Sequence, residues 1–101
     1  MTFRLTERAE RDIVGIYRVS AETFGVAQAD AYHRKLKQTF EIIGDQPRLA
    51  RERQEISPPV RVHPCGSHII IYTICPDETV LIVRVRHGRE DWLDHADATD
   101  R

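Results

Sequence analysis

The stretch SHIIIYTICPDETVLIVRVRH, residues 67–87, decides the fold. Two runs rich in β-branched residues, 67–74 and 79–86, flank the turn-forming CPDE, so we expect two strands that pair antiparallel. The first run is apolar at both sets of alternating positions, Ile69 and Ile71 on one face and Ile70, Tyr72 and Ile74 on the other. A strand that is apolar on both faces belongs in the centre of a sheet.

Further strands are predicted on the N-terminal side of this pair. VRVH at 60–63 precedes the turn PCG, and TFRL at 2–5 reads as a short first strand. The segment 45–58 is polar and bounded by prolines, and it leaves room for one more short strand around 52–56.

Two helices are predicted between the first strand and this segment. With Thr6 as N-cap, apolar side chains recur at spacings of three and four as far as Gly25, which ends the first helix. The second runs from about Val26 to Ile43 and is stopped by Gly44 and Pro47. The expected buried faces are Ala9, Ile13, Ile16, Tyr17, Ser20 and Phe24, then Ala29, Tyr32, Leu36, Phe40 and Ile43.

This element order predicts an α+β fold. A helical hairpin packs on one face of a mostly antiparallel sheet, in a two-layer β-α-α-β-β-β arrangement that gains a strand if residues 52–56 pair. The 101 residues suit one domain, 1–101, with a single core. We expect residues 88–101 to form a mobile C-terminal tail.

Composition and charge narrow the class of protein. The charged start MTFRLTERAERD is unlike a secretory signal, and no apolar run approaches the roughly 20 residues of a membrane span. We therefore expect a cytoplasmic protein without a membrane partner. The formal net charge of −1 gives no support for direct phosphate binding to DNA or RNA. Thirteen Arg against two Lys favour specific, bidentate pairing instead.

Neither a disulfide nor a bound metal or cofactor is predicted. A strand between Cys65 and Cys75, at roughly 3.3 Å per residue, would hold the thiols far beyond the roughly 7 Å Cα limit for a bridge. His63, Cys65 and His68 offer three ligands across one turn, whereas a structural zinc site usually takes four.

A basic cluster, Arg84, Arg86, His87 and Arg89, follows the last apolar run. If the strand reaches His87, alternation places His87 on the face of Val83 and Val85, and the two strand arginines on the other. A histidine at a strand end is either hydrogen-bonded to a nearby backbone group or carboxylate, or it titrates in catalysis. We favour the structural role.

Three segments, LTERAERDIVGIYRVSAETFGVAQADAY (5–32), VRVHPCGSHIIIYTI (60–74) and VLIVRVRHGRED (80–91), are diagnostic in this order. They resemble the helical hairpin, the Arg-then-GSH-apolar-Tyr strand pair and the closing I-x-R-V-x-H-x-R-x-D strand of ParE-type toxins of the RelE/ParE superfamily. The resemblance covers residues 4 to 95. It implies the toxin of a type II toxin–antitoxin pair. The implied partner is a ParD-like antitoxin with a ribbon-helix-helix, DNA-binding end and a tail that wraps the toxin.

The resemblance leaves the target open, because one scaffold carries two activities. ParE-type relatives are associated with blocking DNA gyrase and hence replication, and RelE-type relatives with cleaving mRNA on the ribosome. We favour a non-enzymatic gyrase poison that causes growth arrest and meets DNA only through its antitoxin. The alternatives are a RelE-like ribonuclease and a non-toxic module that only binds antitoxin.

The two main readings assign the same residues different roles. A ribonuclease must activate a ribose 2′-OH and stabilise a phosphorane. Its catalytic residues here would be His87, Arg61 and Arg84, with Glu55 and His68 as further candidates. The C-terminal lysines and late tyrosine of ribosome-dependent relatives are absent. A recognition surface would instead use Arg61, His68, Tyr72, Arg84, Arg86, His87, Arg89 and Trp92. Arg61 could equally pair with Glu52 or Glu55 at a sheet edge, and Trp92 could cap the core.

Overall fold

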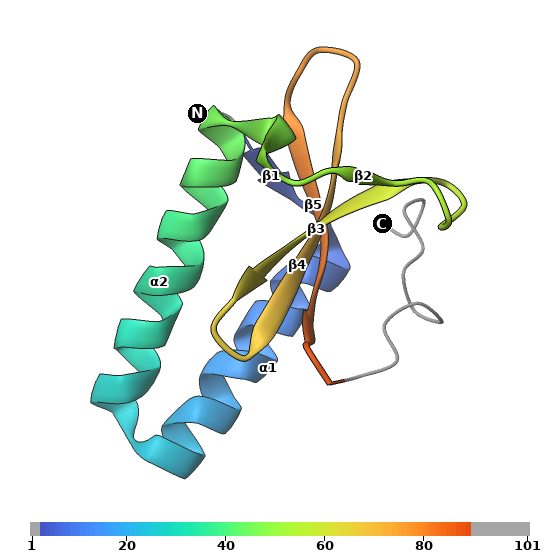
Figure 1. Ribbon diagram of the computed structural model, residues 1–101. Coiled ribbons are helices and arrows are strands. Elements are labelled where there is room, and N and C mark those ends of the chain that lie inside the picture. Colours follow the sequence, from blue (N-terminus) through green and yellow to red (C-terminus); the bar gives the residue numbers. More distant parts are fainter. Residues whose placement is uncertain (1–2, 90–101) are drawn as a thin grey trace.

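The computed structural model describes residues 3–89, which form two helices against a five-stranded sheet (Figure 1). The elements in order are β1 (Phe3–Leu5), α1 (Glu7–Phe24), α2 (Val26–Asp45), a 3₁₀ turn (Pro47–Leu49), β2 (Glu52–Arg53), β3 (Val60–Cys65), β4 (His68–Ile74) and β5 (Val80–His87). The predicted α+β architecture is confirmed. The extra strand predicted near 52–56 exists as the two-residue β2.

The sheet has the order β1-β5-β4-β3-β2. Neighbouring strands from β2 to β5 pair antiparallel, and β1 pairs parallel to β5, with Phe3 opposite Val80. The strand that is apolar on both faces, β4, is the central one, as predicted. Because β1 is short, β5 is paired on both sides only over its first half, and α1 lies beside the rest.

Backbone caps position the two helices. Thr6 Oγ1 accepts from the Ala9 amide at 3.0 Å, as an N-cap should, and donates to the Val83 carbonyl at 2.7 Å, which ties the helix start to β5. Gly25, with φ +94°, ends α1 and lets α2 begin at once. Gly44 does not stop α2, contrary to prediction. It is buried within the last turn, and the helix ends only before Pro47, which cannot continue it.

Apolar clusters cover both faces of the sheet. The larger lies between the sheet and the helical hairpin, and its fully buried members include Ala9, Leu36, Ile43, Ile70, Tyr72, Val80 and Ile82. The smaller, on the opposite face, comprises Ile56, Val60, Ile71 and Val83. The predicted helix faces are buried or half-buried except for Phe24. That residue is 67% exposed, because it is the last residue of α1, at the tip of the hairpin.

A β-bulge in β5 changes which side chains share a face. Tyr72 pairs with Ile82 and Ile71 with Arg84, so Val83 has no residue opposite it. Val83 therefore joins the smaller cluster, whereas Val85 joins the cluster under the helices. The prediction that Val83 and Val85 share one face is wrong, because the extra residue shifts the alternation by one.

No helix within residues 3–89 has the length and apolar character needed to cross a membrane.

Candidate functional site

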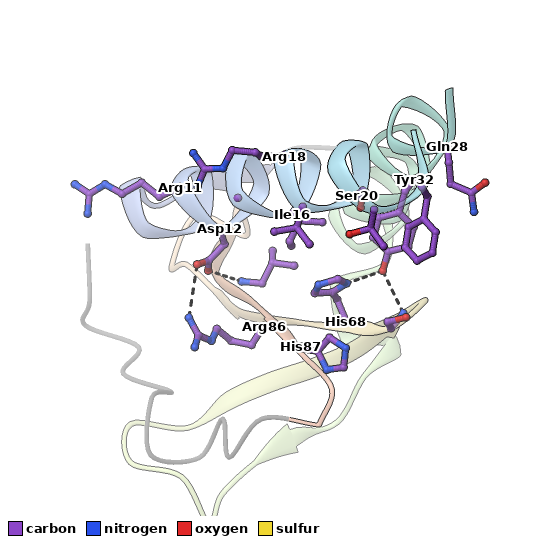
Figure 2. A pocket seen from close by; sticks show the side chains of 16 residues that line it. Arg11, Asp12, Ile16, Arg18, Ser20, Gln28, Tyr32, His68, Arg86 and His87 are labelled. Atoms are coloured by element: carbon purple, nitrogen blue, oxygen red, sulfur yellow. Dashed lines mark hydrogen bonds and ion pairs between the residues drawn. The ribbon is translucent and has the colours of Figure 1, made fainter. Parts of the chain in front are cut away.

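A groove of about 750 Å³ runs between α1, the start of α2 and the ends of β4 and β5. Figure 2 shows Asp12 and Ile16 pointing from α1 toward the sheet, with His68, Arg86 and His87 facing them from the strands. The helical hairpin and the end of β5, which carry two of the three diagnostic segments, meet in this groove. Three of the predicted site residues, His68, Arg86 and His87, line it.

Tyr32, His68 and His87 form a cluster at one end of the groove (Figure 2). The Tyr32 hydroxyl donates to the Cys65 carbonyl at 3.0 Å and accepts from the Ser67 amide at 3.1 Å. It also lies 2.7 Å from His68 Nδ1. Since the one hydroxyl proton is directed to Cys65, we assign the proton of this last bond to Nδ1. The His68 and His87 rings meet edge to face with centroids 5.4 Å apart.

Tyr32 acts in this cluster as a neutral phenol. Burial raises its pKa, so the hydroxyl stays protonated at neutral pH. Gly66 gives the ring room, because a Cβ at that position would lie 2.7 Å from the Tyr32 ring, and its φ of +59° suits glycine. The β3–β4 turn and α2 therefore fix the orientation of His68.

Arg84 does not lie on the surface where partner contacts were predicted. Its Nε and Nη2 donate to Asp12 Oδ2 and Oδ1 at 2.8 and 3.0 Å, and its side chain is only 8% exposed. Asp12 also accepts from the Val85 amide at 3.0 Å and lies 3.7 Å from Arg86 Nη1. The carboxylate thus caps the part of β5 that β1 leaves unpaired, and the Arg84 charge is used inside the protein. Arg86 stays partly exposed at the groove.

Arg61 and Tyr72 lie outside the groove, opposite each other on β3 and β4. Arg61 Nη1 donates to the Ala50 carbonyl at 2.6 Å, and the Tyr72 hydroxyl to the Pro47 carbonyl at 2.7 Å. Tyr72 is fully buried, which raises its pKa and places its side chain away from the surface that a partner can reach. The backbone of Arg61 pairs with that of Glu52, so Arg61 does lie near the edge of the sheet. Its guanidinium, however, donates to a backbone carbonyl in the segment after α2 and not to a carboxylate.

The remaining predicted residues divide between the groove and the end of the chain. His87 is exposed, and its Nδ1 lies 3.2 Å from the Arg89 amide, which is the kind of backbone contact expected of a structural histidine. Arg89, two residues after His87, is also exposed. Trp92 and most of the predicted tail, from residue 90 onward, lie outside the residues that the structure describes.

The candidate metal ligands do not form a centre. Cys65 and Cys75 are free thiols, and Cys65 is buried against Thr39, 3.4 Å from its hydroxyl. His68 Nδ1 is bonded to Tyr32. Among residues 3–89 no three His, Cys, Asp or Glu side chains are grouped so that they could hold a metal ion.

Two residues that build the groove were not among the predicted site residues. The predicted buried face of α1 does not include Asp12, yet Asp12 follows Ala9 by three and precedes Ile16 by four, which is the spacing of that face. Tyr32 was assigned correctly to the buried face of α2, but nothing in its spacing indicated that its hydroxyl meets His68.

Comparisons with known proteins bear on the family and the fold. A family model described as "ParE toxin of type II toxin-antitoxin system, parDE" matches residues 3–92. Toxin ParE1 of Mycobacterium tuberculosis is 32% identical over 89 residues, 88% of this chain and 91% of that protein. Toxin ParE1 of Caulobacter vibrioides is 33% identical over 85 residues, 84% and 86% of the two chains. Toxin ParE of Escherichia coli is 30% identical over 89 residues, 88% and 86%.

A solved structure described as a chromosomal ParDE TA system from P. aeruginosa superposes with a TM-score of 0.74. It covers 86% of this chain and 95% of its own, at 16% sequence identity, and so supports the fold. The family match and the curated relatives each span most of the chain, as the three diagnostic segments did. The chain therefore belongs to the ParE toxin family of type II toxin–antitoxin systems.

Proposed function

We propose that this ParE-type toxin stops growth by binding DNA gyrase in the cytoplasm, without catalysing a reaction, and that a ParD-like antitoxin neutralises it by direct binding. The parDE description of the family and the ParDE structure at this fold support an antitoxin partner. Gyrase is the target associated with ParE-type toxins. In this proposal the toxin is linked to DNA only through the DNA-binding antitoxin.

The residues predicted to catalyse RNA cleavage lie apart in the structure, which supports a toxin that is not a ribonuclease. Arg84 is bound to Asp12, and Arg61 to the Ala50 carbonyl. Along β4, the partners of Arg61 and His87 are four residues apart, or about 13 Å at the strand rise. Hydrogen-bonding groups that act on one phosphate must converge within about 3 Å of its oxygens. These three side chains do not converge in that way.

The groove supports the reading as a binding surface. Its floor includes Ile16 and Val85, and Arg11, Arg18 and Arg86 lie at its margins. An apolar floor beside arginines suits an amphipathic protein segment with acidic side chains, and such a segment can order as it binds.

A gyrase supercoiling and DNA-cleavage assay with purified toxin, with and without equimolar antitoxin, tests the proposal. We expect supercoiling to be lost, or double-strand breaks to be trapped, and the antitoxin to reverse the effect. Unaffected gyrase together with cut mRNA in a parallel ribosome assay would contradict it. An absence of activity in both assays and of growth arrest on expression would leave a module that only binds antitoxin.

One observation favours ribonuclease activity as a second candidate function. Two imidazoles and a phenol, from His68, His87 and Tyr32, lie together in a groove that Arg86 also lines. Histidine pairs can move protons to and from ribose and phosphate oxygens. In that case the catalytic pair would be His68 and His87, instead of the predicted trio with Arg61 and Arg84.

A further inference from the structure

Gly15 occupies the middle of α1, where neither packing nor backbone conformation requires a glycine. Its φ is not positive; among the glycines within residues 3–89, positive values occur at Gly25 and Gly66. A Cβ built at Gly15 meets no atom of the described residues within 4 Å. In a helix interior glycine is less favourable than any residue except proline. Gly15 therefore costs stability without an internal benefit, unlike Gly66, whose close contact with Tyr32 demands it.

The surface around Gly15 is a saddle between two hollows. Gly15 lines the groove between α1 and the sheet, and also a shallower hollow on the outer side of α1 that Glu10 and Val14 share. Val14 and Val19 beside it are 62% and 59% exposed. A helix surface without a side chain, flanked by exposed apolar groups, lets the backbone of another chain approach closely.

Two arginines frame the saddle. Arg11 precedes Gly15 by four residues and Arg18 follows it by three, so both share the helix face of Gly15. Figure 2 shows both side chains extending outward from α1. Arg11 makes one exposed ion pair, with Glu7 at 3.5 Å, which a stronger partner can displace. Arg18 makes no ion pair with any of the described residues.

We propose that an acidic, partly apolar segment of the antitoxin crosses α1 at Gly15. Its backbone contacts Gly15, its carboxylates pair with Arg11 and Arg18, and its apolar side chains contact Val14 and Val19. Charge complementarity selects this occupant, because Arg11 and Arg18 line both hollows, whereas Glu7 and Glu10 line only the outer one. The inference rests on the proposed neutralisation by an antitoxin and adds where the antitoxin's closest approach lies.

Calorimetric titration of the full-length toxin with its purified cognate antitoxin tests the proposal. Gly15→Ala should raise the Tm of the free toxin by roughly 4–8 °C, since alanine favours the helix. The same variant should weaken antitoxin binding at least about tenfold, and Gly15→Leu about a hundredfold, because each side chain displaces the partner backbone. Arg18→Gln should weaken binding and flatten its dependence on salt. Glu41→Ala, an exposed substitution on α2 and outside both hollows, should leave the affinity within about twofold.

The outcomes separate this inference from the function on which it rests. Tight binding by the wild type together with unchanged affinity of Gly15→Ala and Gly15→Leu would overturn the crossing at Gly15 and leave neutralisation intact. A wild-type toxin that does not bind the antitoxin would overturn neutralisation itself. Circular dichroism of each variant checks the fold, so that an affinity lost through unfolding is recognised.

Discussion

Asp12 and Arg84 lie 72 residues apart in the chain and form a two-point ion pair that joins α1 to β5. The Nε–Oδ2 and Nη2–Oδ1 distances are 2.8 and 3.0 Å, and the two side chains are 13% and 8% exposed. The same carboxylate caps the Val85 amide. One wall of the groove is thus fixed to the other by a single acidic side chain.

Removing this acidic charge should destabilise the fold severely. Asp12→Asn leaves the Arg84 guanidinium buried without a counter-charge, so we expect the free energy of unfolding to fall by about 3–5 kcal/mol. Urea unfolding of the isolated toxin measures the loss. The double variant Asp12→Leu with Arg84→Met, in which neither charge remains, should recover part of it, because the Val85 amide still loses its acceptor. A loss below about 1 kcal/mol in the single variant would show that the pair behaves like an exposed one.

The Tyr72 hydroxyl should matter for stability and for its alkaline limit. Tyr72→Phe leaves the Pro47 carbonyl without this donor, so we expect a loss of about 1–3 kcal/mol in urea unfolding. Burial raises the pKa of Tyr72, so its neutral form stabilises the fold below pH about 10, and that contribution disappears as pH rises through the folded-state pKa.

Thermal unfolding between pH 9 and 11 should therefore decline less steeply in Tyr72→Phe than in the wild type. Some decline should remain, because the pKa of Tyr32 is raised in the same direction. Equal slopes in the two proteins would contradict the account of Tyr72.

Glu78 should contribute to resistance against acid. Arg48 donates to both of its carboxylate oxygens, at 2.9 and 3.3 Å, and thereby lowers the pKa of Glu78. A lowered carboxylate pKa stabilises the fold above the unfolded value of about 4.3, and the contribution is lost as pH falls through the folded value.

Between about pH 5 and 3, the Tm of Glu78→Gln should therefore fall less than that of the wild type. The difference should be small, since the pair is about 60% exposed. Glu22→Gln, with no ion pair among residues 3–89, serves as control. If the Tm of Glu78→Gln fell with pH as steeply as that of the wild type, the ion pair with Arg48 would not be a source of acid resistance.

His87→Gln distinguishes recognition from catalysis in the groove. Gln keeps hydrogen-bonding capacity but cannot exchange a proton near neutral pH, so a non-catalytic toxin should still arrest growth when the variant is expressed. A ribonuclease that uses His87 should lose toxicity and keep nearly full antitoxin affinity. Colony counts after induction, with affinity measured on the purified variant, provide both readings.

The sequence predicted the fold better than the site, for physical reasons visible in β4 and β5. The continuous apolar run of β4 and the helix spacings depend on local chemistry, and the elements predicted from them were correct. The bulge at Val83 lies in the pairing of β5 with β4, which the local pattern of β5 does not encode. The burial of Arg84 depends on Asp12, a distant residue, so a basic cluster that looked exposed contains an internal ion pair.

The central claim, that toxicity needs no catalysis, is tested most directly by a titration of gyrase with toxin. At a gyrase concentration well above the dissociation constant, a binder should abolish supercoiling at about one toxin per binding site, and the residual activity should not fall further with incubation time. Inhibition that deepens with time at a small fraction of one toxin per gyrase would mean turnover, and would contradict the account.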